Sequence, residues 1–217
     1  MKSKRLGLIL ILAFIAGGVI YFPSALSKDA QLYEGTELTG TASDFRLIDQ
    51  NGVFVSLSDL KGKVVVLTFM DSECKDTCPL TAVHFREAYR GLDQNEMERV
   101  VFLGVNVNVE ESAVADMLET TRAWHLDEIP SWHFLAGSRD SLEPVWKDYG
   151  VSAAHNPDGN SIMHTPGTFL IDPLGQQRWY VSTPFFNDDE TNFVPPLSEL
   201  LLNHIHELLL ERDNDGL

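Results

Sequence analysis

A chain of 217 residues with 44% hydrophobic residues is long enough to enclose one substantial core, and no shift in composition suggests a second folded domain. The sequence contains 32 acidic and 16 basic residues, and its formal net charge is −16. Nucleic acid and anionic lipid surfaces are poor partners for so acidic a chain. We therefore expect one acidic globular domain with appendages, and no nucleic-acid partner.

The first 27 residues predict a membrane anchor or uncleaved signal. Three basic residues precede an uncharged run from Leu6 to Phe22, which is at the short end for spanning a bilayer and long for the core of a signal peptide. Because the basic flank lies on the N-terminal side, the N-terminus is expected to stay cytoplasmic. The rest of the chain is then expected on the extracytoplasmic side of the cell membrane, as in a single-pass protein. Cleavage near Ala25 and Ser27 is the alternative.

Residues 28–36 are polar and aperiodic, and we expect them to link the anchor to one folded domain over residues 37–212, followed by an acidic tail over residues 213–217. The domain opens with FRLIDQNGVFVSL, in which apolar residues flank Gln50-Asn51-Gly52. Because Asn-Gly is a strong turn signal, this pattern predicts a β-hairpin.

The remaining pattern alternates strands with helices. Strands are predicted over residues 64–70, 100–108 and 132–137, helices over 79–91, 111–126, 141–151 and 197–212, and a hairpin over 166–182 that turns at 172–175. Such alternation implies parallel crossovers and an α/β sheet. The order predicts a thioredoxin-like fold with an N-terminal β-hairpin extension and an N-terminal anchor helix.

The two cysteines of the chain lie in the stretch DSECKDTCPL. Cys74 is predicted in the loop after the central strand, and Cys78 precedes Pro79 in the first turn of a helix. The positive end of the helix dipole favours a thiolate at this point. A local disulfide, a reducing dithiol and a pair of soft-metal ligands all remain open.

A soft cation such as Cu(I) is well served by two thiolates and a third neutral ligand. His164 is the best candidate, because in a thioredoxin-like fold the loop entering the third core strand packs against the cysteine loop. His155, ahead of the last hairpin, is a weaker candidate. The other five histidines are expected to be ordinary core or surface residues: His84, His125, His133, His204 and His206.

The segments CKDTCP and HTPGTFLIDPLG resemble motifs of the Sco/SenC family of membrane-anchored copper proteins, and WHFLAGSRDSLEPVWKDYGV is similar to the segment between them. The resemblance extends over roughly residues 37–210. It implies that Cys74, Cys78 and His164 bind a copper ion. It also implies that the ion is delivered to, or used in maturing, the binuclear copper centre of cytochrome c oxidase. The partner would be the copper-bearing subunit of that oxidase or another copper carrier.

The sequence departs from the family pattern at two places. NVNVEES, residues 106–112, replaces the usual Asp-Pro-x-x-Asp-Thr segment, which indicates a divergent member. Met163 stands where the family often has Asp. We expect it to be a core residue, and a soft extra ligand is the alternative.

A copper-binding assembly factor, which is not an enzyme in the strict sense, is the leading interpretation. A thiol-disulfide oxidoreductase is the alternative: Cys74 would attack a partner disulfide and Cys78 would resolve the mixed disulfide. Pro166 suits this alternative, because thiol-disulfide relatives place such a proline in cis beside their cysteines. A peroxidase is disfavoured, since no Thr-x-x-Cys arrangement is present.

Overall fold

The computed structural model describes residues 35–155, 162–182 and 195–215. The anchor predicted over residues 1–27 lies outside these ranges, as does most of the predicted linker. Within the described ranges, no helix is both long and apolar enough to cross a membrane.

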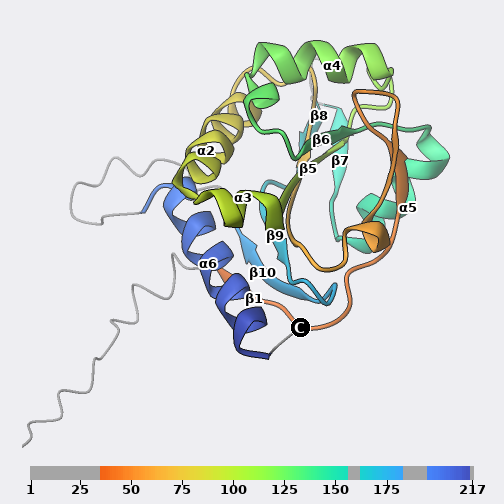
Figure 1. Ribbon diagram of the computed structural model, residues 1–217. Coiled ribbons are helices and arrows are strands. Elements are labelled where there is room, and N and C mark those ends of the chain that lie inside the picture. The colour runs from red at the N-terminus through yellow and green to blue at the C-terminus, as the bar shows by residue number, and fades with distance from the viewer. Residues whose placement is uncertain (1–34, 156–161, 183–194, 216–217) are drawn as a thin grey trace, which may run out of the picture.

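The domain is built on a six-stranded sheet with the order β1-β10-β9-β4-β5-β6 (Figure 1). In that order the strands are β1 (Thr36–Glu37), β10 (Gln177–Val181), β9 (Thr168–Ile171), β4 (Val64–Met70), β5 (Val100–Asn106) and β6 (Trp132–Leu135). Strands β4, β5 and β6 are parallel, whereas β9, β10 and β1 extend the sheet in antiparallel pairings. The predicted α/β class and the predicted C-terminal hairpin are therefore confirmed.

The two central strands are covered on both faces. Every residue of β4 and β5 is buried, which explains their continuous apolar sequences VVVLTFM and VVFLGVN. Their register pairs Val64 with Val100 and Met70 with Asn106. The carboxyl end of β4 therefore delivers the cysteine loop to the middle of one edge of the sheet.

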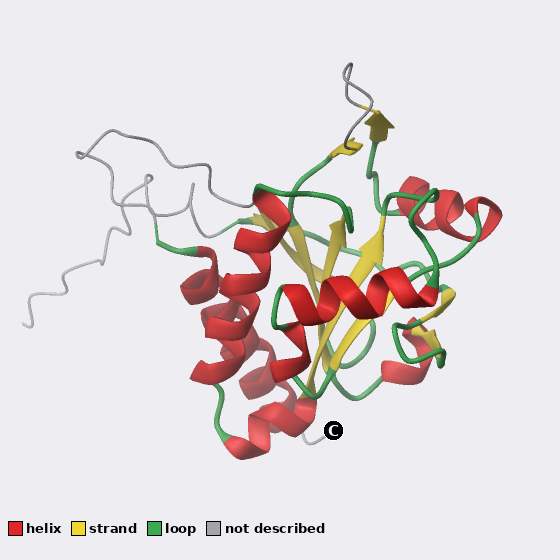
Figure 2. Ribbon diagram, turned by 90° about the horizontal axis from the view of Figure 1, so that it is seen from above, coloured by secondary structure: helices red, strands yellow, loops and turns green. Residues whose placement is uncertain are grey.

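In the described ranges, five α-helices surround the sheet, and Figures 1 and 2 show them on both of its faces. They are α2 (Thr77–Gly91), α3 (Gln94–Arg99), α4 (Val114–Ala123), α5 (Arg139–Asp148) and α6 (Leu197–Asp215). Apolar residues of α2, α4 and α6 form one core with the sheet. Residues of α5 form a second core on the other face, together with the hairpin of β2 (Arg46–Ile48) and β3 (Phe54–Ser56).

Several details differ from the sequence predictions. Helix α2 begins at Thr77, two residues before Pro79, and α4 is shorter than the predicted range. Helix α3 and a second hairpin, β7 (Ala153–His155) with β8 (Ile162–His164), were not predicted. Helix α6 continues beyond residue 212, where Asp213 forms an ion pair with Arg99 at 2.6 Å.

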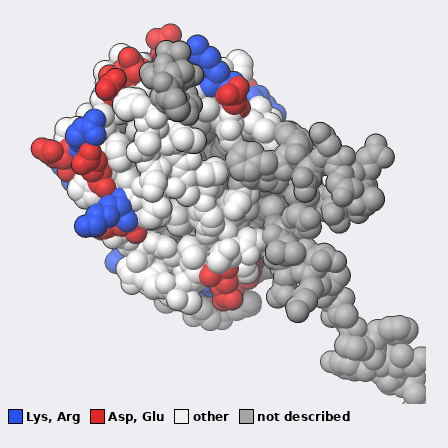
Figure 3. Space-filling view, turned by 180° about the vertical axis from the view of Figure 1, so that it is seen from behind, with Lys and Arg blue, Asp and Glu red and all other residues white. Residues whose placement is uncertain are grey.

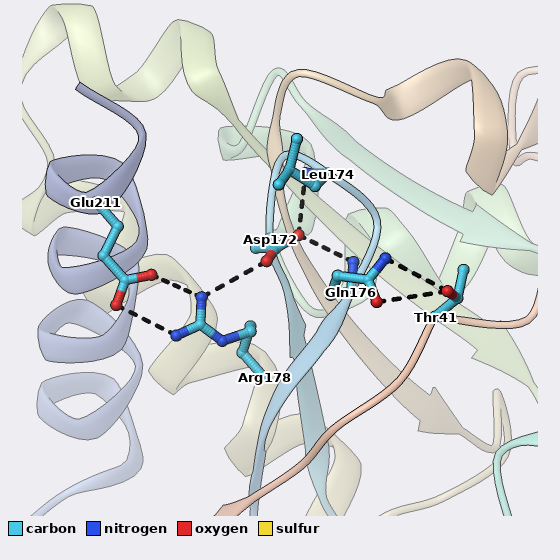
Figure 4. Close-up of polar contacts among 6 residues, drawn as sticks. All are labelled: Thr41, Asp172, Leu174, Gln176, Arg178 and Glu211. Carbon is cyan, nitrogen blue, oxygen red and sulfur yellow. Dashed lines mark hydrogen bonds and ion pairs between the residues drawn. The ribbon is translucent and has the colours of Figure 1, made fainter. Parts of the chain in front are cut away.

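A polar network joins the C-terminal hairpin to α6 (Figure 4). Asp172 accepts hydrogen bonds from the backbone N–H groups of Leu174 and Gln176, which closes the turn between β9 and β10. Arg178 donates to both carboxylate oxygens of Glu211, at 2.6 and 3.2 Å. A cavity of about 190 Å³ next to this network also touches Gly62, which precedes β4. The cavity therefore lies at the end of β4 opposite the cysteines.

The face from which the β7–β8 hairpin projects carries few charges near its centre. In Figure 3, the visible charged side chains lie mainly at the left and upper margins, where basic groups lie beside acidic ones, and one acidic group lies near the bottom. The side chain of Met163 on β8 is 60% exposed. The expectation of a core methionine is therefore wrong. Met163 is the exposed middle residue of a three-residue strand in which no residue is fully buried.

Candidate metal and dithiol site

The loop between β4 and α2 positions both cysteines. The backbone N–H of Cys74 donates to the carbonyl oxygen of Asp71 at 3.1 Å, which folds the loop back on the end of β4. Cys78 lies in the first turn of α2, and its backbone N–H donates to Cys74 Sγ at 3.4 Å. Both thiols are free, with Cys74 partly exposed and Cys78 buried. The loop therefore presents one accessible sulfur above one buried sulfur.

The two thiols differ strongly in acidity. The pKa of Cys74 is lowered to about 6, first by a hydrogen bond from the Cys78 thiol and then by the backbone N–H groups of Cys78, Asp76 and Thr77, against the opposing effect of burial. The pKa of Cys78 is raised well above its ordinary value by the same hydrogen bond, by burial and by the nearby negative charge of Cys74. At neutral pH, Cys74 is the thiolate of the pair and Cys78 carries the proton.

His164 is the last residue of β8, and its imidazole faces the buried cysteine. Its Nε2 lies 3.8 Å from Cys78 Sγ, and its Nδ1 lies 3.1 Å from the carbonyl oxygen of Thr165. A carbonyl can only accept, so Nδ1 carries the proton and donates it. In the neutral imidazole, the Nε2 lone pair then faces Cys78 and can accept its proton or bind a metal ion.

Cys78 is thus the member of the site that contacts both of the others. Cys74 and Cys78 are joined by their hydrogen bonds, and Cys78 and His164 by the 3.8 Å contact. In the described ranges, however, no three His, Cys, Asp or Glu side chains already enclose a position for a metal ion. A three-ligand site requires Cys74 Sγ and His164 Nε2 to turn toward a common centre.

The other histidines form contacts of their own. His155, the weaker candidate, lies on β7 with its Nε2 3.8 Å from Glu110 Oε1. Four more lie beside carboxylates: His84 beside Glu87, His133 beside Asp49, His204 beside Glu207 and His206 beside Glu96. His125 has a positive φ of 57° between α4 and the short helix η2 (Leu126–Glu128). Among the described residues, none of these hydrogen bonds or ion pairs joins any of the six histidines to a cysteine.

The segment after His164 is held by one buried and one partly buried hydrogen bond. The hydroxyl of Thr68 donates to the carbonyl oxygen of Gly167 at 2.9 Å, and the hydroxyl of Tyr180 donates to that of Pro166. Gly167 has a φ of 142°, and a Cβ there would lie 2.4 Å from the Tyr180 ring. The peptide bond before Pro166 is trans, since the described residues contain no cis peptide bond. The cis geometry considered for Pro166 is therefore not observed.

Asp71, which is fully buried beneath the cysteine loop, belongs to no motif of the sequence that predicts the site. Its Oδ1 accepts from the Asn108 side-chain amide at 3.1 Å and from the Glu73 backbone at 3.0 Å, and its Oδ2 accepts from the backbone N–H of Ile162 at 3.0 Å. The available signal was a charged residue directly after an apolar strand. The divergent segment over residues 106–112 thus supplies Asn108 as a partner of the loop.

The sheet order, the helices on both faces and a cysteine pair at the start of α2 define a thioredoxin-like α/β protein with a dithiol and a histidine at one edge of the sheet. The model of the SCO1/SenC family matches residues 34–191. The chain belongs to the SCO1/SenC family.

The chain is also similar to individual proteins of two kinds, a thiol-disulfide oxidoreductase and Sco proteins. The chain is 33% identical over 181 residues to the thiol-disulfide oxidoreductase ResA of Bacillus subtilis, covering 81% of this chain and 84% of that protein. The copper-bound structure of Bradyrhizobium japonicum ScoI shares the fold with a TM-score of 0.62 and 23% identity, over 78% of this chain and 99% of that one. BsSco, for which a disulfide switch is described, is a member of the Sco family of cytochrome c oxidase assembly proteins. It matches with a TM-score of 0.61 and 21% identity, over 79% of this chain and 95% of that one.

Proposed function

We propose that this protein binds one copper ion through Cys74, Cys78 and His164 and passes it to the copper-bearing subunit of cytochrome c oxidase or to another copper carrier. The main support for this proposal is the 3.8 Å contact between Cys78 Sγ and His164 Nε2. The Nδ1 of the same ring is hydrogen-bonded to the Thr165 carbonyl, so Nε2 is the nitrogen that faces the cysteine. The contact joins residues 86 positions apart into one donor set. The copper in related structures supports the same proposal.

The donor set fits a soft, monovalent ion. Two sulfurs and one imidazole nitrogen match the ligand preference of Cu(I), whereas structural zinc takes four ligands. Cys74 is deprotonated at neutral pH because its pKa is about 6. Binding a metal at Cys78 requires displacement of the proton that burial and Cys74 hold there. We therefore expect copper affinity to rise with pH.

The position of the site suits transfer of a bound ion. Cys74 is partly exposed in the loop before α2, and the face seen in Figure 3 carries few charges near its centre. The partly exposed Cys74 sulfur would give a partner's thiol or thioether access to the ion. The anchor predicted over residues 1–27 would hold the domain at the extracytoplasmic face of the membrane, where the oxidase is embedded.

A copper titration of the reduced protein against a competing Cu(I) chelator tests this proposal. We expect one equivalent to bind tightly in the parent and at least 100-fold more weakly in His164→Ala, since loss of a direct ligand exceeds the 10- to 100-fold effect of losing an outer contact. His84→Ala, which removes a histidine beside Glu87 on the same helix as Cys78, is the matched control and should bind as the parent does. Copper affinity indifferent to His164 would contradict the ligand assignment.

The acidity difference between the cysteines favours a second function, thiol-disulfide exchange. The Cys74 thiolate would attack one sulfur of a partner disulfide, forming a mixed disulfide and releasing the partner's other sulfur as a thiolate. Cys78 would then attack Cys74 Sγ, and its proton would pass to the second partner sulfur as that group leaves. The partner is reduced by two electrons and the Cys74–Cys78 pair is oxidised to a disulfide. The likeness to ResA supports this function.

A further inference from the structure

Asp71 links the two halves of the candidate site, and its backbone N–H also contacts the Cys78 sulfur. It lies at the end of β4, and its carbonyl oxygen accepts the N–H of Cys74 while its carboxylate accepts the N–H of Ile162. Ile162 is the first residue of β8, and His164 follows two positions later. Because side chains alternate along a strand, Ile162 and His164 lie on the same face of β8. The carboxylate therefore fixes the strand that presents the imidazole.

The contacts of this carboxylate are those of a positioning group. Asp71 is 0% exposed, and the three donors described above are neutral: one side-chain amide and two backbone N–H groups. Hydrogen bonds from neutral donors to a buried carboxylate are strong and directional. Asn108 adds a third segment to the same carboxylate, the loop after β5. Three segments far apart in the sequence are thus held at one side chain.

We propose that Asp71 is a positioning residue that sets the distance between His164 and Cys78. This inference rests on the proposed copper function for its main readout. Without the carboxylate, β8 loses its direct hydrogen bond to the cysteine loop. The backbone pairing of β8 is with β7, and the bond from the Thr165 N–H to the Ser152 carbonyl lies just beyond that ladder, so neither holds β8 to the cysteine loop.

Asp71→Asn keeps the shape and replaces one acceptor oxygen with a donor that must face another donor. It also removes a negative charge near Cys78, which Ile162→Pro leaves in place while removing the bond to β8. We expect a 10- to 100-fold loss of copper affinity, the usual effect of losing an outer contact of a ligand. Asp172→Asn is the matched control. Asp172 is also buried and accepts two backbone N–H groups, but it lies at the opposite end of the sheet. The control should lower stability while leaving copper affinity within twofold of the parent.

A double-mutant cycle separates positioning from a general structural effect. If Asp71 acts through His164, Asp71→Asn should cause no further loss of copper affinity in the His164→Ala background. Equal losses in both backgrounds would overturn the proposal. Should Asp71→Asn fail to fold, Ile162→Pro removes the same hydrogen bond from the other side, at the first residue of a strand, where proline is tolerated. It should cause a loss of the same size, and unchanged affinity would refute the inference.

A copper-free measurement keeps the inference distinct from the proposed function. Amide hydrogen exchange at Ile162 and the imidazole chemical shifts of His164 should both change in Asp71→Asn and stay unchanged in Asp172→Asn. If the parent binds no copper but these changes occur, the copper proposal fails and the positioning role stands. If Ile162 exchange and His164 shifts are the same in the parent and Asp71→Asn, the positioning role is wrong whatever the copper affinity.

Discussion

The acidity of Cys74 gives the sharpest prediction, because its main cause is a single group. The first contribution to its pKa of about 6 is the hydrogen bond from the Cys78 thiol, ahead of the backbone N–H groups at the start of α2. Cys78→Ala removes this donor and should raise the pKa of Cys74 toward the ordinary value of 9.0. Cys78→Ser keeps a hydroxyl donor at the same place and should hold the pKa low.

The size of the effect determines the assay. At pH 7, a pKa of about 6 gives a thiolate fraction of roughly 0.9, and a pKa near 9 gives about 0.01. Intrinsic nucleophilicity falls as the pKa falls, with a Brønsted coefficient of about 0.4–0.5, so much of this ~90-fold difference is cancelled in a rate at one pH. The pH dependence of alkylation therefore reports the pKa more faithfully than the rate at pH 7.

The experiment follows alkylation of Cys74 by iodoacetamide from pH 4 to pH 10 in the parent and both variants, with Cys74→Ala as the blank. We expect a midpoint near 6 in the parent, a clearly higher midpoint in Cys78→Ala and an intermediate or parent-like midpoint in Cys78→Ser. An unchanged midpoint in Cys78→Ala would refute the reasoning. It would show that the helix N-terminus alone lowers the pKa of Cys74.

Three further predictions concern stability. Gly167→Ala should lower the free energy of unfolding by about 1–3 kcal/mol from backbone strain, plus the cost of displacing the Tyr180 ring; Gly52→Ala, at a φ of 77° in open space, should lack the second cost, and equal losses in thermal unfolding would contradict this. Phe85→Ala should cost about 3–5 kcal/mol because Phe85 is 0% exposed, and a loss below 1 kcal/mol in urea unfolding would be inconsistent with that packing. Arg178→Gln should cost at most about 1 kcal/mol at pH 7, because its partner Glu211 is half exposed. Arg178 lowers the pKa of Glu211, so this difference should be present at neutral pH and disappear as the pH falls through that lowered pKa, which parallel unfolding at pH 7 and pH 3 will check.

The sequence was informative where burial leaves a simple pattern. Strands β4 and β5 are continuous apolar runs because helices cover both faces of the sheet, and the two hairpins with Asn-Gly and Asp-Pro-Leu-Gly turns are marked by turn chemistry. Helix α3 has no buried residue, so it shows no apolar periodicity. Its start was nevertheless encoded in a capping box, in which Asp93 accepts from Glu96 and the Glu96 side chain accepts in return.

The site was harder to predict because its contacts are long-range. The pairing of Cys78 with His164 depended on knowledge of the fold, since 86 residues separate them. The link from Asp71 to Ile162 spans 91 residues and ends on a backbone N–H, which carries no side-chain signal at all. Met163 was misplaced for a related reason: a three-residue strand is too short for alternation to distinguish an exposed position from a buried one.

The two proposed functions use the same two sulfurs, and Cys78 is the one that also contacts His164. Its single proton has two acceptors within reach, the Cys74 thiolate and His164 Nε2, and it cannot be donated to both at once. Copper binding requires both sulfurs as thiolates, whereas a completed exchange reaction leaves them joined in a disulfide that has no thiolate to offer. A copper-loaded molecule is therefore unable to reduce a partner, and an oxidised molecule is unable to hold the ion. Because the disulfide would leave His164 without a ligand role, the proposed copper-bound state is the one that would depend on holding β8 against the cysteine loop, which is the contact that Asp71 makes.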